Sequence, residues 1–357
     1  MKEEVNRNFI KNTSDDIEVK RFNNVISRLD LYIEEKLSDI DNKYKKIIEE
    51  VRLRVNKPLM LNMSGIDIFI DKDGNLLFED INSFIVNKEM IDKTFEKICE
   101  YSIYAVEDEI RNGFVTIKGG HRIGISGKSV YKNNSLFTIK DISSINIRIS
   151  RQKIGVSNKV IKYIIHNKKI YNTLIVSPPQ CGKTTLLRDI IRNLSNGIPQ
   201  YNFSGLKVAV IDERSEIAAS YRGIPQNDIG IRTDVLDSSN KYDGTMMMLR
   251  SLSPQVIATD ELGANEDIKA IHNCIKAGVK IITTIHGEDL EDIKSKPNIS
   301  EIIKEKIFER IIILDNSNGV GTIKEVIDGK TYNAMIKNKG GKDVSIKNYS
   351  MYNDSYT

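Results

Sequence analysis

The residues best suited to chemistry lie in one segment, VSPPQCGKTT (176–185), which approaches the Walker A phosphate-binding pattern G-x-x-x-x-G-K-[ST]. The segment follows an apolar run, TLIV (173–176), and leads into a helical pattern, KTTLLRDIIRNLSNG (183–197). A strand, a loop and a helix in this order present backbone amides and a helix N-terminus, which attract phosphate. The segment therefore predicts a nucleotide-binding loop, which we assign to Pro179, Gln180, Cys181, Gly182, Lys183, Thr184 and Thr185.

Three residues of this loop have distinct expected roles. Gly182 lets the backbone approach a phosphate, Lys183 reaches the outer phosphates, and the Thr184 hydroxyl suits Mg²⁺. Ser177 stands where the pattern has its first glycine. That glycine serves the turn from strand to loop, so serine there costs backbone freedom but removes no ligand group. We therefore expect the loop to bind ATP, with an affinity that depends on how Ser177 is accommodated.

A hydrolase also needs an acid that holds Mg²⁺ and a base that activates water. The stretch VIATDELG (256–263) supplies Asp260 for the metal and Glu261 for the attacking water, at the end of an apolar run. A solvated acidic helix start is the alternative interpretation of this pair. A further apolar run, VAVID (208–212), lies between the loop and the acidic strand, which favours the RecA/AAA-like branch of P-loop ATPases over GTPases or nucleotide kinases.

Weaker candidates end two neighbouring strands. Asp212 could support the metal and Glu213 the water, although a helix cap explains both equally simply. His286 ends IITTIH (281–286) and could sense the γ-phosphate or orient Glu261, or it could be purely structural. An arginine finger, often contributed by a neighbouring subunit, could be any one of Arg222, Arg232, Arg250 and Arg310.

Hydrophobic patterning predicts the scaffold that positions these residues. Apolar runs alternate with helical patterns after residue 150, which indicates a mainly parallel sheet covered on both faces, at TLIV, VAVID, VIATDE, IITTIH and RIIIL (310–314). Before residue 150, alternation and turn signals such as Asp73-Gly74 indicate a small α+β domain. The expected organisation is a charged helical segment (1–50), the α+β domain (51–150), an α/β P-loop ATPase domain of RecA/AAA-like type (151–335) and a polar tail (336–357).

Composition limits the partners. The net charge of +4 on 357 residues and the absence of Trp give neither the basic stripe nor the stacking platform of a nucleic-acid-tracking protein. Three cysteines without a pattern indicate neither a disulfide framework nor a zinc site. The start, MKEEVNRNF, lacks the apolar run of a secretory signal, and no run reaches the length of about 18 residues that spans a membrane. We expect a reducing compartment and peripheral membrane contact.

The chain also resembles a known family, the stage III sporulation protein AA family of endospore-forming bacteria. The matching stretches extend over both expected domains: VRLRVNKPL, GGHRIGISG, INIRIS, PPQCGKTTLLRDIIR, VIDERSEIA, GIPQNDIGIRTDVLD, MMMLRSLSPQVIATDELG and AGVKIITTIHG. More distantly, LRSLSPQVIATDE and AGVKIITTIHGED are similar to the Walker B and histidine regions of type II/IV secretion ATPases.

The resemblance implies a ring-forming homo-hexameric ATPase that uses ATP and Mg²⁺. Such a protein would work in the mother-cell cytoplasm, peripherally at the membrane around the forespore, with membrane proteins of the same operon that form a channel. Lys183, Thr184, Asp260 and Glu261 would carry the family's nucleotide roles, and Asp212, Glu213 and His286 occupy its acidic and histidine positions. Ser177 departs from the glycine usual at its position.

Two other functions fit the same sequence. A nucleic-acid-dependent RecA-like ATPase would be stimulated by single-stranded DNA or RNA. A structural ring subunit would bind nucleotide with little turnover, against which the intact Glu261 argues.

Overall fold

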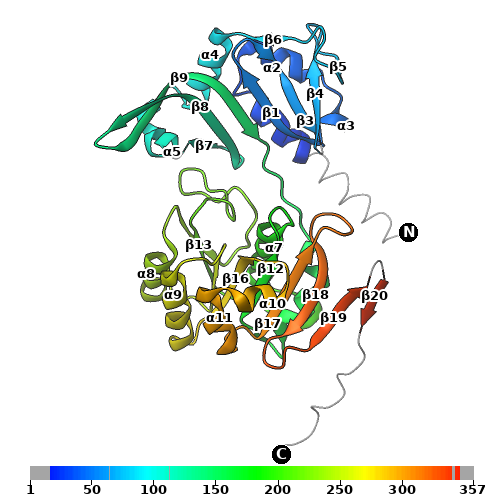
Figure 1. Ribbon diagram of the computed structural model, residues 1–357, viewed down its shortest axis with the longest axis vertical. Helices are drawn as coiled ribbons and strands as arrows, with labels where there is room; N and C mark the ends of the chain where they lie inside the picture. Colours follow the sequence, from blue (N-terminus) through cyan, green and yellow to red (C-terminus); the bar gives the residue numbers. More distant parts are fainter. Residues whose placement is uncertain (1–16, 64, 112, 340–341, 346–357) are drawn as a thin grey trace, which may run out of the picture. The chain divides into compact units, whose positions relative to one another are not determined.

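The computed structural model describes residues 17–63, 65–111, 113–339 and 342–345, and the chain divides into two compact units (Figure 1). The first unit contains the described residues up to Arg151 together with Ala219–Gln226. The second contains Gln152–Ala218 and the described residues from Asn227 on. Each unit has its own hydrophobic core, so each is described by itself.

The first unit is an antiparallel seven-stranded sheet with helices against it, in the strand order β5-β4-β3-β1-β9-β8-β7. Its strands are β1 (Ile48–Arg54), β3 (Met60–Met63), β4 (Ile66–Ile70), β5 (Leu76–Leu77), β7 (Phe114–Ile117), β8 (His121–Lys132) and β9 (Ser135–Arg148), and β2 (Lys57–Pro58) pairs with β6 (Ile85–Val86). Its helices are residues 17–26, α2 (Leu31–Ser38), α3 (Asn42–Lys45), α4 (Lys88–Ile98), the 3₁₀ turn η1 (Ile103–Val106) and α5 (Glu107–Arg111). The N-terminal helices share one core with the sheet, so in the described part of the chain they are not separate from it.

Helical periodicity in the sequence predicts one continuous helix over residues 23–37 and another over 90–113, and the structure interrupts both. The pattern over residues 23–37 is broken where Asp30 accepts a hydrogen bond from the Tyr32 amide (3.0 Å) and starts α2 as its N-cap. The pattern over residues 90–113 is broken after α4, where Glu100 and Tyr101 take φ values of 49° and 60°. Because left-handed backbone cannot continue an α-helix, α4 ends there and α5 forms separately.

The segment Ala219–Gln226 belongs to the first unit although it follows the strand VAVID in sequence. The Glu100 carboxylate accepts hydrogen bonds from the Tyr221 hydroxyl (2.7 Å) and the Arg222 guanidinium (2.6 Å). The Gln226 side-chain oxygen accepts one from the Gly119 amide (2.7 Å). No sequence feature indicated this association, because it depends on contacts between residues more than 100 positions apart.

The second unit is built on a nine-stranded sheet in the order β14-β13-β15-β16-β12-β17-β18-β19-β20. The strands are β12 (Thr173–Ser177), β13 (Val208–Asp212), β14 (Thr233–Asp237), β15 (Val256–Thr259), β16 (Lys280–His286), β17 (Arg310–Asp315), β18 (Thr322–Asp328), β19 (Ala334–Lys339) and β20 (Lys342–Ser345), with a small β10 (Ile165–His166) and β11 (Lys169–Ile170) pair apart from them. The helices are η2 (Val156–Lys159), α6 (Ile161–Ile164), α7 (Lys183–Asn196), η3 (Pro199–Tyr201), α8 (Lys241–Ser251), α9 (Asn265–Lys276), α10 (Leu290–Ser295) and α11 (Pro297–Lys304).

Alternate residues of the central strands supply two cores, one on each face of the sheet. Ile175 packs in a core with the apolar face of α7, whereas its neighbours Leu174 and Val176 pack in a core with residues of α8 to α11. Because both faces are covered, these strands contain consecutive buried residues and appear in the sequence as apolar runs. Figure 1 shows α7 beside β12, and α8 near β13.

The predicted fold class, a RecA/AAA-like α/β domain with a mainly parallel sheet preceded by a smaller α+β unit, is confirmed. β14, β13, β15, β16, β12 and β17 run parallel, and β16 separates the loop strand β12 from the acidic strand β15. Strands β18, β19 and β20 then continue the sheet antiparallel. The last two extend into the expected tail (336–357), of which residues 340–341 and 346–357 lie outside the described residues. No helix in the described ranges is long and apolar enough to cross a membrane.

Candidate functional site

The loop between β12 and α7 ends at a glycine in left-handed backbone conformation. Gly182 has φ 86° and immediately precedes the first residue of α7, Lys183. This left-handed backbone favours glycine, and a Cβ there would also make a tight contact of 3.2 Å with Val320 Cγ1. Pro179 and Gln180 are exposed, Cys181 is buried, and Thr184 and Thr185 are half-buried in the first turn of α7.

Ser177 occupies the position of the missing glycine without backbone strain. It is the last residue of β12, is fully buried, and does not have a positive φ. Its hydroxyl donates a hydrogen bond to the carbonyl of Pro178 (2.8 Å). Because this position does not use left-handed backbone, the structure places no demand for glycine on it.

The hydroxyl and the carboxylate predicted for Mg²⁺ are in direct contact. Thr184 Oγ1 donates to Asp260 Oδ2 at 2.8 Å. The other carboxylate oxygen accepts hydrogen bonds from the Glu261 amide (2.9 Å) and from the Thr284 hydroxyl, which also accepts from the Glu261 amide (2.9 Å). Oxygen donors of this kind suit Mg²⁺, which usually takes one or two protein carboxylates and completes its shell with phosphate and water. Within the described part of the chain, no group of three or more His, Cys, Asp or Glu side chains is placed to hold a metal ion.

A chain of polar contacts connects the loop lysine to the predicted base. Lys183 Nζ lies 2.9 Å from His286 Nδ1, and His286 Nε2 lies 3.2 Å from Glu261 Oε1. An ammonium group only donates, so we assign Nδ1 as acceptor and place the imidazole proton on Nε2, directed at the glutamate. The other oxygen of Glu261 pairs with Arg214 at 2.9 Å.

Burial and two neighbouring carboxylates act on the pKa of Lys183 in opposite directions. Burial lowers the pKa of Lys183 by desolvating the ammonium, and the nearby carboxylates of Asp260 and Glu261 oppose that shift.

The strand register explains why the His286 imidazole lies beside the loop: Ser177 of β12 pairs with His286 of β16. The carboxyl end of β16 therefore meets the start of the loop.

Two predicted residues have other contacts. The Asp212 carboxylate accepts hydrogen bonds from the amides of Glu216 (2.9 Å), Ile217 (3.1 and 3.2 Å) and Ala218 (2.8 Å), so it organises the turn after β13. Burial raises the pKa of Asp212 to about 6, against the effect of these amides. Glu213 pairs with Lys241. Neither carboxylate bonds to the phosphate loop: Asp212 holds the turn that follows β13, and Glu213 pairs with the first residue of α8.

The arginines singled out as fingers are mostly held in place. Arg310 is 7% exposed, pairs with Asp328 (3.0 Å) and has its guanidinium 3.9 Å from the centre of the Tyr171 ring. Arg232 donates to the carbonyl of Ser195 (2.8 Å), and Arg222 bonds within the first unit. Arg250 is exposed on α8.

Sequence reasoning missed two residues that contact the predicted catalytic carboxylates. Arg214, which directly follows Asp212 and Glu213 in the sequence, forms the ion pair with Glu261. Thr284 is buried in β16 and links Asp260 to the Glu261 backbone. The sequence could have indicated Thr284, because it lies two residues before His286 and alternate residues of a strand share a face.

The matched family decides the identity of the chain. The family model described as sporulation stage III, protein AA matches residues 19–333. The chain belongs to this family. The stage III sporulation protein AA of Bacillus subtilis (strain 168) is 39% identical over 306 residues, which cover 86% of this chain and 94% of the relative.

Other similarities are partial. The uncharacterized protein ycf45 of Cyanidium caldarium is 25% identical over 165 residues, which cover 46% of each chain. Among solved structures, the ATPase DotB of Legionella pneumophila has a TM-score of 0.47 and 16% identity, over 74% of this chain and 72% of that one. The fold class of the present chain is defined by its own strand order rather than by this likeness.

Proposed function

We propose that this protein binds and hydrolyses ATP with Mg²⁺. The observation that carries the proposal is the convergence of loop, acid and base at the carboxyl ends of three adjacent strands, β12, β16 and β15. Ligands of open parallel sheets bind at such ends. The sequence separation of more than 70 residues between Thr184 and Asp260 makes their direct contact a property of the fold rather than of local sequence.

In the proposed mechanism the loop amides and Lys183 bind the outer phosphates, and Gly182 allows their close approach. Thr184 and Asp260 would hold Mg²⁺, which would neutralise part of the phosphate charge when bound. Glu261 accepts a proton or hydrogen bond from the attacking water. The imidazole of His286 orients Glu261 through its 3.2 Å contact with the carboxylate. The same imidazole contacts Lys183, so the position of Glu261 depends on the residue that binds the outer phosphate.

We further propose that the active form is a ring, a homo-hexamer, that acts as a motor at a secretion-like channel between mother cell and forespore. Family membership supports the sporulation setting, and the named relative is a stage III sporulation protein. In this proposal the protein contacts the membrane peripherally, through membrane proteins of the same operon. Nucleotide hydrolysis would change how neighbouring subunits pack and so move the partner proteins.

The test uses the full-length protein with two substitutions. Lys183→Ala should abolish both ATP binding and turnover, because it removes the cation that meets the outer phosphates. Glu261→Gln should abolish turnover but retain binding, because only the base is lost. Lys276→Ala, at the end of α9, is the matched lysine control and should leave both unchanged. Full turnover in Lys183→Ala or Glu261→Gln would refute the assigned roles.

Two additional measurements address the alternatives. Light scattering with ATP should give the mass of a hexamer, and a stable monomer at micromolar concentration would refute the ring. Several-fold stimulation of turnover by single-stranded DNA or RNA would favour the nucleic-acid-dependent ATPase. Tight ATP binding with negligible turnover by the wild type would favour the structural ring subunit.

A further inference from the structure

Arg214 lies at one end of the chain of polar contacts that begins at the phosphate loop. Its guanidinium Nη1 is 2.9 Å from Glu261 Oε2. Glu261 Oε1 contacts His286, and the same imidazole contacts Lys183. The four residues follow four strands that are adjacent in the sheet, β13, β15, β16 and β12. The guanidinium is therefore connected to the loop by one contact from each strand end to the next.

The turn that carries Arg214 is held firmly, whereas its side chain is exposed. The Asp212 carboxylate accepts hydrogen bonds from the amides of residues 216–218. Arg188, on the helix that begins at the loop, donates to two carbonyls of the same stretch (2.5 and 2.6 Å). The side chains of Arg214 and Glu261 are 63% and 32% exposed, and an ion pair as exposed as this stabilises a protein little. The guanidinium can therefore leave Glu261 while its backbone stays in place.

The ion pair occupies the side chain that is proposed to activate water. One carboxylate oxygen of Glu261 contacts His286 Nε2 and the other contacts Arg214. An attacking water must lie within hydrogen-bond distance of the base. Since the contact with His286 orients the carboxylate, the oxygen that pairs with Arg214 is the one left for the water. Departure of the guanidinium would open this place.

A phosphate group is a better partner for the guanidinium than a single exposed carboxylate. The planar fork of arginine binds phosphate oxygens in pairs, and such bonds stabilise the charge of a phosphoryl group during transfer. We infer that Arg214 moves from Glu261 to the outer phosphate when ATP binds, an inference that rests on the proposed ATP hydrolysis. The movement exposes the base and brings a cation to the phosphate in one step. ADP lacks the outer phosphate, so the pair with Glu261 persists when ADP is bound.

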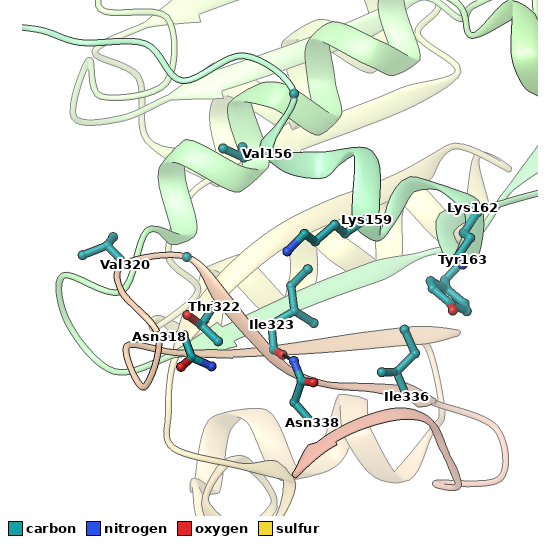
Figure 2. Close-up of a pocket in the computed structure, with 12 residues that line it drawn as sticks. Val156, Lys159, Lys162, Tyr163, Asn318, Val320, Thr322, Ile323, Ile336 and Asn338 are labelled. Carbon is teal, nitrogen blue, oxygen red and sulfur yellow. Dashed lines mark hydrogen bonds between the residues drawn. The ribbon is translucent and has the colours of Figure 1, made fainter. Parts of the chain in front are cut away.

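Lysines at the cavity shown in Figure 2 lie beside a different part of the sheet. Lys159 and Lys162 line this cavity together with residues of β18, β19 and the connection between β17 and β18. β17 and β16 flank β12 on opposite sides. The cavity therefore adjoins the β17 side of the loop strand, whereas Glu261 follows β15 on the other side. Arg214 is in direct contact with the base and has the shorter path to the phosphate that the water attacks.

The test uses Arg214→Ala and Arg214→Lys in the full-length protein. Arg148→Ala is the matched control, because Arg148 of the first unit is 65% exposed and pairs with Glu50 at 3.1 Å. Steady-state hydrolysis gives kcat for ATP. Calorimetry with Mg²⁺ gives the Kd values of ADP and of AMP-PNP, an ATP analogue that resists hydrolysis and keeps the outer phosphate.

Arg214→Ala should lower kcat at least about 100-fold and weaken AMP-PNP binding about tenfold, while the Kd of ADP changes less than about twofold. Arg214→Lys keeps the charge without the fork, so it should restore less than about a tenth of the wild-type kcat. The control should leave all three quantities unchanged. Both Arg214 variants should unfold at the wild-type temperature, since the ion pair is exposed.

Equal or higher kcat in Arg214→Ala would overturn the inference, because Arg214 would then only hold the base. An equal loss of affinity for ADP and AMP-PNP would also overturn it, since a contact with the outer phosphate affects AMP-PNP alone. Absence of ATP turnover by the wild type would instead refute the proposed function.

Discussion

Thr284 offers a sharp test of how the acidic residues are held. Its single hydroxyl donates to the Asp260 carboxylate and accepts from the Glu261 amide (2.9 Å). Thr284→Val preserves the shape of the side chain and removes both bonds. A hydrogen bond to a charged group contributes about 1.5–3 kcal/mol. If that energy positions Asp260 and Glu261 in the transition state, kcat should fall about 10- to 100-fold.

The neighbouring residue provides a matched control. Thr283 is also fully buried in β16, but its hydroxyl has no hydrogen-bond partner among the described residues. Thr283→Val removes an unsatisfied buried hydroxyl, so it should preserve kcat and leave the melting temperature equal or higher. Both variants are compared with the wild type by steady-state ATP hydrolysis, ADP affinity and thermal unfolding.

The measurements distinguish a positioning role of the Thr284 hydroxyl from a purely structural role of its side chain. We expect Thr284→Val to lower kcat with ADP affinity nearly unchanged, and Thr284→Ser, which keeps the hydroxyl, to restore most of the activity. Wild-type kcat in the folded Thr284→Val protein would refute the positioning argument. An equal fall in kcat for the Thr283→Val control would show that packing of β16, not the hydroxyl, controls the rate.

Three further outcomes follow from individual contacts. Ser177→Gly should change the Kd for ATP by less than about threefold and lower stability by about 0.5–1 kcal/mol, because the position needs no left-handed backbone; a large gain in affinity by calorimetry would contradict this. Burial lowers the pKa of His121 from 6.5 to about 4, so the unfolded chain binds more protons between these values and stability should fall by about 3 kcal/mol as the pH drops from 6.5 to 4. His121→Asn should flatten that dependence in amide-exchange measurements on β7 to β9, and a parallel decline in both proteins would exclude His121 as its source. Arg310→Met should cost about 3 kcal/mol of unfolding free energy, because it leaves Asp328 without its buried partner, and loss of turnover at unchanged stability would instead indicate a finger.

The apolar runs were a reliable guide to the second unit because each central strand is buried on both faces. TLIV, VAVID, VIATDE, IITTIH and RIIIL correspond to β12, β13, β15, β16 and β17. The edge strand β14 was not predicted, since TDVLD is only half-buried and carries two acids. In the first unit the helices predicted as continuous are broken by a cap at Asp30 and by left-handed residues at Glu100 and Tyr101, which periodicity does not register.

Sequence by itself determined the chemical groups of the site. The loop motif, the Asp260–Glu261 pair and the terminal His286 each follow an apolar run, and parallel strands bring their carboxyl ends to one edge of a sheet. Only the tertiary structure decided which of the groups meet. The order of β13, β15, β16 and β12 puts His286 between Lys183 and Glu261. The Asp212 carboxylate instead accepts hydrogen bonds from backbone amides of the turn that follows β13. Strand order and side-chain partners depend on contacts between residues far apart in the chain, which local patterns do not encode.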